Sequence, residues 1–250
     1  MKDCKANVSK IETFGSVDGP GVRFVVFMQG CNMRCKYCHN PETWCLNAKT
    51  SMQYTASELF EIAFKYRHYW GKDMTNGGIT VSGGEPLLQI DFLIEFFTLA
   101  KQHGVHTAID TSGQPFLMEQ KYLEKFNQLM AVTDLFIVDI KAFDSVKHKE
   151  LTGYDNKNIL EMLKYLSKNN IDVWIRRVLV PNLTDEEQDL LNTKNFISSL
   201  GNVKRVEILP YQTLGVYKWV NWGLNYPLKD FSSPNKSQVE RAKRLLGLSD

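Results

Sequence analysis

The chain has 250 residues and a mass of 28.8 kDa, which fits one large domain or two small ones. Apolar residues make up 43% and charged residues 23%, a composition that can bury a core without disulfides. Thirty Lys and Arg against 28 Asp and Glu leave a net charge of +2, which argues against a nucleic-acid binder. No apolar run approaches the ~18 residues of a membrane span. The first ten residues, MKDCKANVSK, lack the apolar region of a secretion signal, so we expect a cytoplasmic protein.

Strand-like and helix-like segments alternate along the chain. Runs rich in β-branched and aromatic residues predict strands over 22–28, 79–82, 105–110, 134–141, 172–180 and 203–209. Helical spacing of apolar residues predicts helices over 55–69, 90–103, 119–130, 156–169, 185–200 and 236–246. Such alternation predicts an α/β fold with a mostly parallel sheet, either doubly wound or a barrel. No GxGxxG follows the first strand, and the ends of the chain lie outside the repeat, which favours an incomplete barrel.

Three of the five cysteines lie close together in the sequence CNMRCKYC. Cys31, Cys35 and Cys38 follow the first predicted strand, whereas Cys4 and Cys45 stand apart. Thiolates are soft ligands that suit an iron–sulfur cluster or zinc. His39 or Cys45 could close a four-ligand zinc site, whereas three cysteines alone would leave one iron of a cluster open. Spacing by itself leaves both kinds of site, and unliganded thiols, open.

Charged residues end two of the predicted strands. Residues two apart on a strand share a face, so Asp139 and Lys141 share one face of the strand that starts near Leu135. Asp110 ends the preceding strand in the same way. In a parallel barrel the carboxyl ends of the strands hold the active site. Two carboxylates and a lysine there favour a ligand of mixed charge over an ordinary strand exit into solvent.

Several motifs resemble those of one large enzyme superfamily. CNMRCKYC, with Tyr37 before the third cysteine, resembles the cysteine signature of the radical S-adenosylmethionine (SAM) superfamily, and the SGGEP stretch from Ser82 resembles its GGE motif. The segment FGSVDGPGVRF and the cysteine loop resemble the glycyl-radical-enzyme activases. VDIKAF, VWIRRVLVP and ILPYQTLG resemble the pyruvate formate-lyase activases in particular, and the ferredoxin-like insertion of other activases is absent between Trp44 and Tyr54. The resemblance covers about residues 11 to 246.

The resemblance implies a fold and a set of cofactors. It implies one radical SAM domain over residues 1–250, with a partial (βα)6 TIM-like barrel over about 20–212 and a C-terminal extension over about 213–250. Cys31, Cys35 and Cys38 would hold a [4Fe–4S] cluster whose open iron is chelated by SAM. A monovalent cation beside the SAM carboxylate is left open.

The resemblance also implies contacts to SAM. Gly83, Gly84, Asp110 and Asp139 would lie near the amino end of SAM and Lys141 near its carboxylate, while Tyr37, Cys38 and His39 would lie near the adenine. Gln212 departs from the family pattern, because the activases usually have a histidine at this position. Glutamine can form hydrogen bonds but cannot carry a charge, so this single contact is open.

Two further positions would approach the protein substrate. Asp18 is most simply a turn residue, but its DGPG turn resembles one that approaches the glycine loop of the substrate. Arg176 matches a family position inside the barrel, whereas Arg177, on the opposite face of the strand, is expected at the outer surface. The remaining histidines, at 68, 103, 106 and 148, are expected to be surface or packing residues.

The activity that the resemblance implies is activation of pyruvate formate-lyase. One electron from the reduced cluster would cleave SAM, and the resulting 5′-deoxyadenosyl radical would take hydrogen from a glycine Cα. We expect a monomer that takes electrons from a flavodoxin or ferredoxin and binds neither nucleic acid nor membrane. An activase of another glycyl radical enzyme, or a radical SAM enzyme acting on a small molecule, is the nearer alternative. A zinc-binding domain without enzymatic activity is the more distant one.

Overall fold

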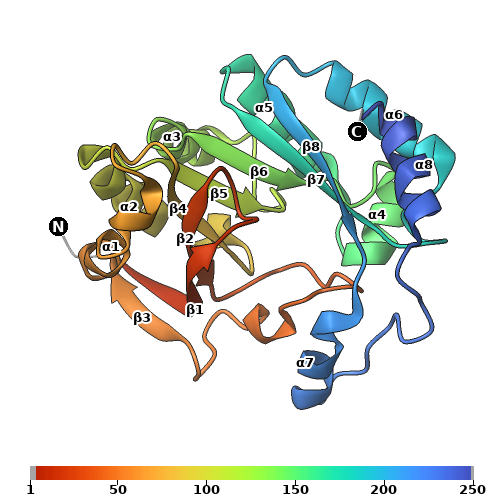
Figure 1. Ribbon diagram of the computed structural model, residues 1–250, viewed down its shortest axis with the longest axis horizontal. Coiled ribbons are helices and arrows are strands. Elements are labelled where there is room, and N and C mark those ends of the chain that lie inside the picture. Colours follow the sequence, from red (N-terminus) through yellow and green to blue (C-terminus); the bar gives the residue numbers. More distant parts are fainter. Residues whose placement is uncertain (1–3, 249–250) are drawn as a thin grey trace. The chain divides into compact units, whose positions relative to one another are not determined.

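A computed structural model describes residues 4–248, and its strands form one eight-stranded sheet (Figure 1). The strand order is β3-β1-β2-β4-β5-β6-β7-β8. The strands are β1 (Lys5–Gly15), β2 (Val22–Met28), β3 (Met52–Thr55), β4 (Gly77–Gly83), β5 (Thr107–Thr111), β6 (Leu135–Asp139), β7 (Val173–Leu179) and β8 (Val203–Pro210). The order has two ends, so the sheet is not closed, and the predicted α/β class is confirmed.

Eight α-helices accompany the strands within residues 4–248. They are α1 (Ala56–Phe64), α2 (Ile90–Gln102), α3 (Gln120–Met130), α4 (Ser145–Thr152), α5 (Lys157–Lys168), α6 (Glu187–Ser198), α7 (Val216–Asn221) and α8 (Lys236–Leu246). Short 3-10 turns lie at Pro41–Thr43, Arg67–Trp70, Pro86–Gln89 and Thr213–Gly215. No helix among residues 4–248 has both the length and the apolar character needed to cross a membrane.

The contacts divide the chain into two compact units. Unit 1 comprises residues 1–32, 43–111 and 115–137, and unit 2 comprises residues 33–42, 112–114 and 138–250. The cysteine motif is therefore shared, with Cys31 in unit 1 and Cys35 and Cys38 in unit 2. The prediction of a single domain over 1–250 stays a prediction, and its outermost residues, 1–3 and 249–250, lie outside the described chain.

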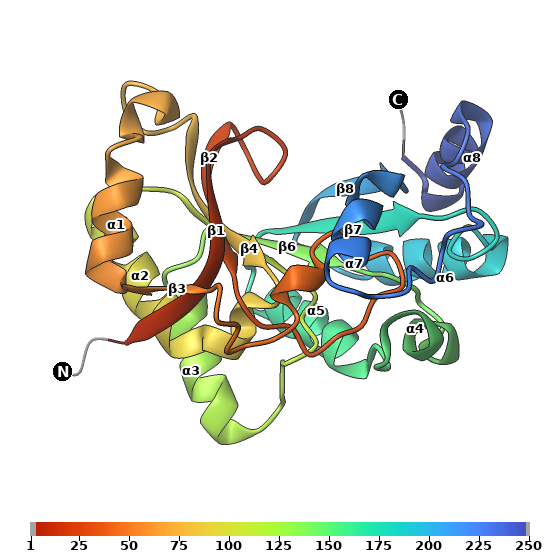
Figure 2. The same cartoon turned by 90° about the horizontal axis from the view of Figure 1, so that it is seen from below.

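Unit 1 combines parallel strands with an antiparallel edge. β2 pairs in parallel with β4, and β4 with β5, in the arrangement that strand–helix alternation predicts. β1 was not predicted; it pairs antiparallel with both β2 and β3. α1 packs beside α2, and α2 packs beside α3 (Figure 2). Apolar residues spaced for one helix face, such as Phe92, Phe96 and Phe97 of α2, are buried there.

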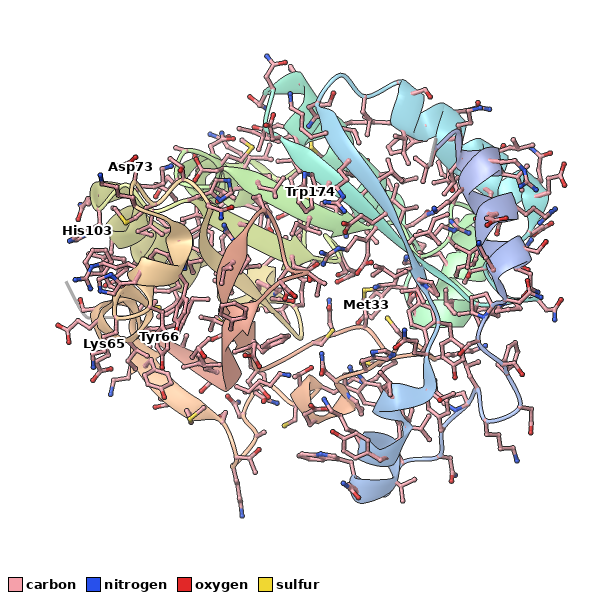
Figure 3. The ribbon with its side chains drawn as sticks, viewed as in Figure 1. Met33, Lys65, Tyr66, Asp73, His103 and Trp174 are labelled. Carbon is pink, nitrogen blue, oxygen red and sulfur yellow. The ribbon has the colours of Figure 1, made fainter. Side chains whose placement is uncertain are left out.

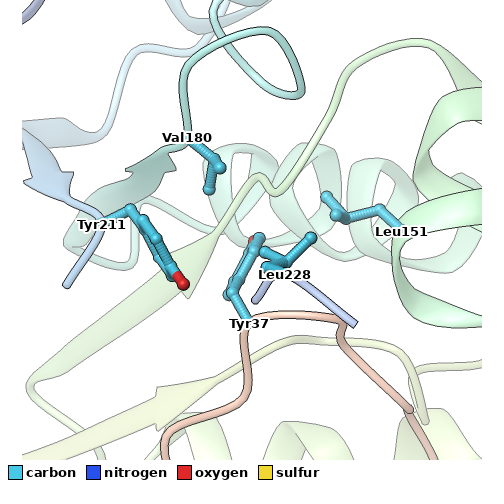
Figure 4. Close-up of a cluster of buried hydrophobic side chains, with 5 residues drawn as sticks. All are labelled: Tyr37, Leu151, Val180, Tyr211 and Leu228. Atoms are coloured by element: carbon cyan, nitrogen blue, oxygen red, sulfur yellow. The ribbon is translucent and has the colours of Figure 1, made fainter. Parts of the chain in front are cut away.

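Unit 2 contains β7, β8 and the five helices from α4 onward. β7 and β8 are parallel neighbours, with Arg176 opposite Glu207 in the register. α6 packs beside α8, where Leu190, Ala242 and Leu246 form a buried cluster with Leu179 of β7. A second buried cluster joins Tyr37, Leu151, Val180, Tyr211 and Leu228, and so draws the cysteine loop into the core of unit 2 (Figure 4).

Helix ends follow the chemistry of their capping residues. Thr55 accepts a hydrogen bond from the Glu58 amide and its own amide donates to the Glu58 carboxylate, so α1 starts one residue later than predicted. Asn235 and Gln238 form the same reciprocal cap on α8, whose predicted bounds are confirmed. α6 starts at Glu187 rather than Asp185, because the Asp185 carboxylate accepts from the Asn182 amide and closes the preceding turn.

Candidate active site

Cys31 lies directly behind β2 and is held by the backbone of unit 1. Its amide donates to the Trp44 carbonyl at 3.3 Å, and the Gly30 amide donates to the Thr43 carbonyl at 2.7 Å. The Gly30 carbonyl in turn accepts from the Glu85 amide at 2.8 Å. The loop after β2 and the GGEP loop after β4 are therefore joined at the carboxyl ends of two parallel strands.

Cys35 and Cys38 form a compact turn in unit 2. The Cys38 amide donates to the Cys35 carbonyl at 3.0 Å, and the Asn40 amide lies 3.4 Å from Cys38 Sγ. Cys35 packs against the buried cluster that contains Tyr37, which is 5% exposed. The turn is therefore held by its own backbone and by the core of unit 2.

The thiols suit a soft metal or an iron–sulfur cluster. None of the five cysteines forms a disulfide, and Cys31, Cys35 and Cys38 are each half-buried. Burial raises the pKa of the Cys35 thiol to about 12, so the free thiol is protonated at neutral pH and metal binding must release its proton. Among residues 4–248, no group of three His, Cys, Asp or Glu side chains is arranged to hold a single metal ion. The chemistry of three soft thiolate donors in one short loop fits an iron–sulfur cluster with one open iron.

Unit 1 places a carboxylate beside the glycine motif. The Ser82 hydroxyl donates to the Asp110 carboxylate at 2.9 Å, so the predicted Asp110 lies at the end of β5 next to the end of β4. Gly83 and Gly84 follow Ser82. A Cβ on Gly83 would lie 2.2 Å from the Met28 amide nitrogen, and a Cβ on Gly84 would lie 2.1 Å from the Gly30 carbonyl oxygen. Both glycines therefore permit a close backbone approach to the end of β2.

Glu85, the acid of the GGE motif, was not singled out as a site residue from the sequence. Its side chain is fully buried and accepts hydrogen bonds from the Leu87 amide at 3.0 Å and from the Thr111 hydroxyl. Thr111 directly follows Asp110. Glu85 therefore joins the glycine loop to the end of β5, and its position in the motif was the only sequence signal for this role.

Unit 2 contains the second charged group of the predicted site. Lys141 Nζ donates to the Asp139 carboxylate at 2.9 Å and lies 5.9 Å from the centre of the Tyr37 ring. Burial by itself lowers the pKa of Lys141, but the Asp139 carboxylate together with the Cys35 and Tyr37 groups outweighs it, and this pKa is held well above its usual value. This ion pair is consistent with the shared face that the sequence predicted for Asp139 and Lys141.

Gln212 and His39 meet through the backbone. His39 Nε2 lies 3.1 Å from the Gln212 carbonyl oxygen, while the Gln212 side chain is exposed. Gly215 lies against the same histidine, because a Cβ there would be 3.0 Å from His39 Cα. The predicted contacts of these residues with SAM stay predictions.

The two residues predicted to approach the substrate lie in different units. Asp18 lies in the turn before β2, where its carbonyl accepts from the Thr80 hydroxyl at 2.7 Å. This is the opposite end of β2 from Cys31. Arg176 is 7% exposed and donates to Glu207 at 2.8 Å. A role for either residue toward the substrate stays a prediction.

The prediction that Arg177 lies at the outer surface is wrong. Its side chain is 1% exposed and pairs with Asp189 of α6 at 2.7 Å. Alternation along β7 does turn Arg177 away from Arg176, but α6 covers that face of the strand.

The packing prediction for the histidines holds for His148, which is fully buried, and His103 lies against Phe60 and Phe64 at the edge of α1 (Figure 3).

The close approach at Gly84 gives a first prediction. Gly84→Ala is expected to lower the free energy of unfolding by about 1–3 kcal/mol, because the new methyl group must displace the Gly30 carbonyl. Gly201→Ala is the control, since no atom lies within 4 Å of a Cβ at that position. Urea denaturation of both proteins measures the difference, and equal stability would show that the loop after β2 can move without cost.

Comparison with known proteins agrees with these features. The family model "Radical SAM superfamily" matches residues 25–193. The pyruvate formate-lyase-activating enzyme of Streptococcus mutans is 51% identical over 239 residues, covering 96% of this chain and 90% of that protein. The enzyme of the same name from Listeria monocytogenes is 47% identical over 249 residues, covering 100% and 99%.

Among solved structures, a radical SAM methyltransferase from Sphaerobacter thermophilus is similar, with a TM-score of 0.62 at 16% identity over 90% of this chain and 63% of that one. This likeness concerns the fold alone and agrees with the partial TIM-like barrel that the sequence predicted. The sequence matches extend over almost the whole chain and include the cysteine motif. The chain belongs to the radical SAM superfamily and, within it, to the family of pyruvate formate-lyase-activating enzymes.

Proposed function

We propose that this chain activates pyruvate formate-lyase by forming a glycyl radical on it. The observation that carries the proposal is the 51% identity, over almost the full chain, to an activating enzyme of that name. The three half-buried cysteines of the motif, none of them in a disulfide, support it, since an iron–sulfur cluster with one open iron needs three cysteine ligands. When bound, the cluster and SAM supply the electron and the radical that removes hydrogen from a glycine Cα.

The chain's own residues bind and orient these groups. Cys31, Cys35 and Cys38 are the cluster ligands. Asp110, with Gly83 and Gly84 beside it in unit 1, takes the ammonium end of SAM, since a carboxylate forms charge-assisted hydrogen bonds with a cation. In unit 2, Asp139 shares the ammonium, and Lys141 takes the SAM carboxylate. Tyr37 and His39 lie near the adenine.

The charged residues give a prediction for SAM binding. Asp110→Ala and Lys141→Ala are each expected to weaken SAM binding by about 10- to 150-fold, since a charge-assisted hydrogen bond typically contributes ~1.5–3 kcal/mol. Anaerobic calorimetric titration of the cluster-loaded proteins measures the affinity. Asp91→Ala is the control, because Asp91 on α2 is exposed and forms an ion pair with Lys125 on α3. Unchanged affinity in both site variants would remove these residues from the SAM site.

Activation itself is tested with the protein substrate. The reduced protein, given SAM and pyruvate formate-lyase from the same organism, is expected to produce a glycyl doublet in electron paramagnetic resonance. About one SAM is consumed per radical when 5′-deoxyadenosine leaves. A strong doublet on another glycyl radical enzyme, with none on pyruvate formate-lyase, would keep the chemistry and overturn the substrate.

The setting of the reaction is part of the proposal. A flavodoxin or ferredoxin supplies the electron, and the protein acts as a monomer in the cytoplasm without nucleic acid or membrane. The nearer alternative, a radical SAM enzyme acting on a small molecule, predicts turnover of SAM without any protein radical. Membership of the radical SAM superfamily argues against a non-enzymatic zinc-binding domain.

A further inference from the structure

The cysteine loop of unit 2 is in contact with a short helix far along the chain. Trp219 of α7 donates its indole N–H to the Cys38 carbonyl at 2.8 Å. Its neighbour Lys218 donates to Asn40 Oδ1 at 2.8 Å and to the Glu42 carboxylate. Two consecutive side chains of α7 therefore contact the third cysteine and the residues that follow it.

Packing brings α7 close to this loop. Trp219 is 4% exposed, and its ring meets the edge of Tyr226 with 5.2 Å between centroids. The Tyr226 hydroxyl lies 2.8 Å from the hydroxyl of Tyr211, which belongs to the buried cluster around Tyr37 (Figure 4). A series of aromatic side chains thus joins α7 to the core on which the cysteine loop rests.

The other side of the loop is held by α4. The Arg34 amide donates to the Thr152 carbonyl at 2.7 Å, and the Lys36 amide donates to the Leu151 carbonyl at 3.0 Å. These carbonyls lie at the end of α4, where no further helical turn supplies N–H groups to donate to them. The end of α4 therefore fixes the peptide groups on both sides of Cys35, and α7 fixes the carbonyl of Cys38.

The outward side of α7 does not explain its conformation. Tyr217 and Val220 of α7 are 61% and 68% exposed, and Leu214 in the turn before the helix is 71% exposed. A helix of six residues has little stability of its own, because the cost of its first turn is spread over few hydrogen bonds. The contacts of Lys218 and Trp219 with the cysteine loop and its core are therefore important for the position of α7.

We propose that Trp219 and Lys218 are positioning residues that set the cysteine loop in its ligand-ready conformation before a cluster is bound. This inference rests on the proposed role of Cys35 and Cys38 as cluster ligands. Groups that hold ligands from behind typically change metal affinity or activity by about 10- to 100-fold when they are lost. Neither residue belongs to a motif of the sequence analysis.

The first test is Trp219→Phe, which keeps an aromatic ring and removes the N–H donor. In the protein without metal, hydrogen exchange of the amides of residues 35–42 is expected to rise about tenfold, while exchange of the α7 amides rises less, because the phenylalanine ring keeps the packing against Tyr226. After anaerobic reconstitution, an iron chelator is expected to remove iron about tenfold faster than from the unchanged protein. Trp222→Phe is the matched control, because Trp222 directly follows the last residue of α7 and is 47% exposed.

The second test uses Lys218. Lys218→Met is expected to accelerate exchange in the loop and iron release, and Lys218→Arg to restore both, since arginine keeps the donors and the charge. Equal behaviour of Trp219→Phe and Trp222→Phe, or loss of protection in α7 itself to the same degree as in the loop, would overturn the inference. Exchange in the metal-free protein does not depend on the reaction, so failure to activate pyruvate formate-lyase would not affect this result.

Discussion

Replacing Cys31, Cys35 or Cys38 by alanine is expected to abolish the iron–sulfur cluster, and activation of pyruvate formate-lyase with it. Three thiolates hold three irons of a cluster, and loss of one leaves an iron without a protein ligand. Anaerobically reconstituted proteins are compared by iron and sulfide content and by their absorption near 400 nm. A zinc site would give a colourless protein in every case.

The control for this experiment is the double variant Cys4→Ala/Cys45→Ala. Cys45 is exposed, and both cysteines stand outside the CNMRCKYC motif. The double variant is expected to keep its cluster in full. Loss of the cluster there would mean that a fourth protein thiolate closes the site and that no iron is open to SAM.

The second large effect is expected at the buried ion pair of unit 2. Asp189 is 5% exposed and accepts from Arg177 at 2.7 Å and from the Asp144 amide at 2.7 Å. Asp189→Ala leaves the guanidinium of Arg177 buried without its carboxylate, which is expected to lower the free energy of unfolding by about 3–5 kcal/mol. Guanidinium chloride denaturation of the metal-free protein measures this loss.

Two further variants separate the causes. Asp172→Ala breaks an exposed pair with Lys204, whose side chains are 49% and 56% exposed, and is expected to cost less than about 1 kcal/mol. The double variant Arg177→Met/Asp189→Leu removes both charges and is expected to recover most of the lost stability. If the double variant is as unstable as Asp189→Ala, the hydrogen bonds to the Asp144 and Phe143 amides matter more than the charge.

The same pair predicts a dependence on pH. Burial raises the pKa of Asp189, but Arg177 and the two amides outweigh it, and this pKa is lowered overall. The stabilisation is therefore complete above the unfolded pKa of about 3.9 and is lost as pH falls from there through the lowered folded pKa. The stability difference between the unchanged protein and Asp189→Ala is expected to shrink over that acid range and to stay constant from pH 5 to 7.

Local sequence patterns predicted most of the regular structure. The run of β-branched and aromatic residues over Val22–Met28 gave the bounds of β2, and helical spacing gave those of α8, because both patterns follow from the repeat of the backbone itself. Parity along residues 135–141 predicted a shared face for Asp139 and Lys141; β6 ends at Asp139, and Lys141, two residues beyond it, forms an ion pair with Asp139. The missed elements are β3, α4 and α7, which are short, and β1, whose alternation is interrupted by register shifts. β1 pairs with β2 and β3, and that pairing is long-range.

The sequence by itself indicated the chemistry, through a cysteine motif and a glycine motif that resemble those of one superfamily and through charged residues at the ends of predicted strands. These signals are short-range, since each lies within a few residues of chain. Tertiary structure alone decided that α6 buries Arg177 against Asp189, and that Trp219 reaches the Cys38 carbonyl across 181 positions of sequence. Such partners are chosen by packing, because a hydrogen bond across a folded core leaves no periodic trace in either of the two segments that form it.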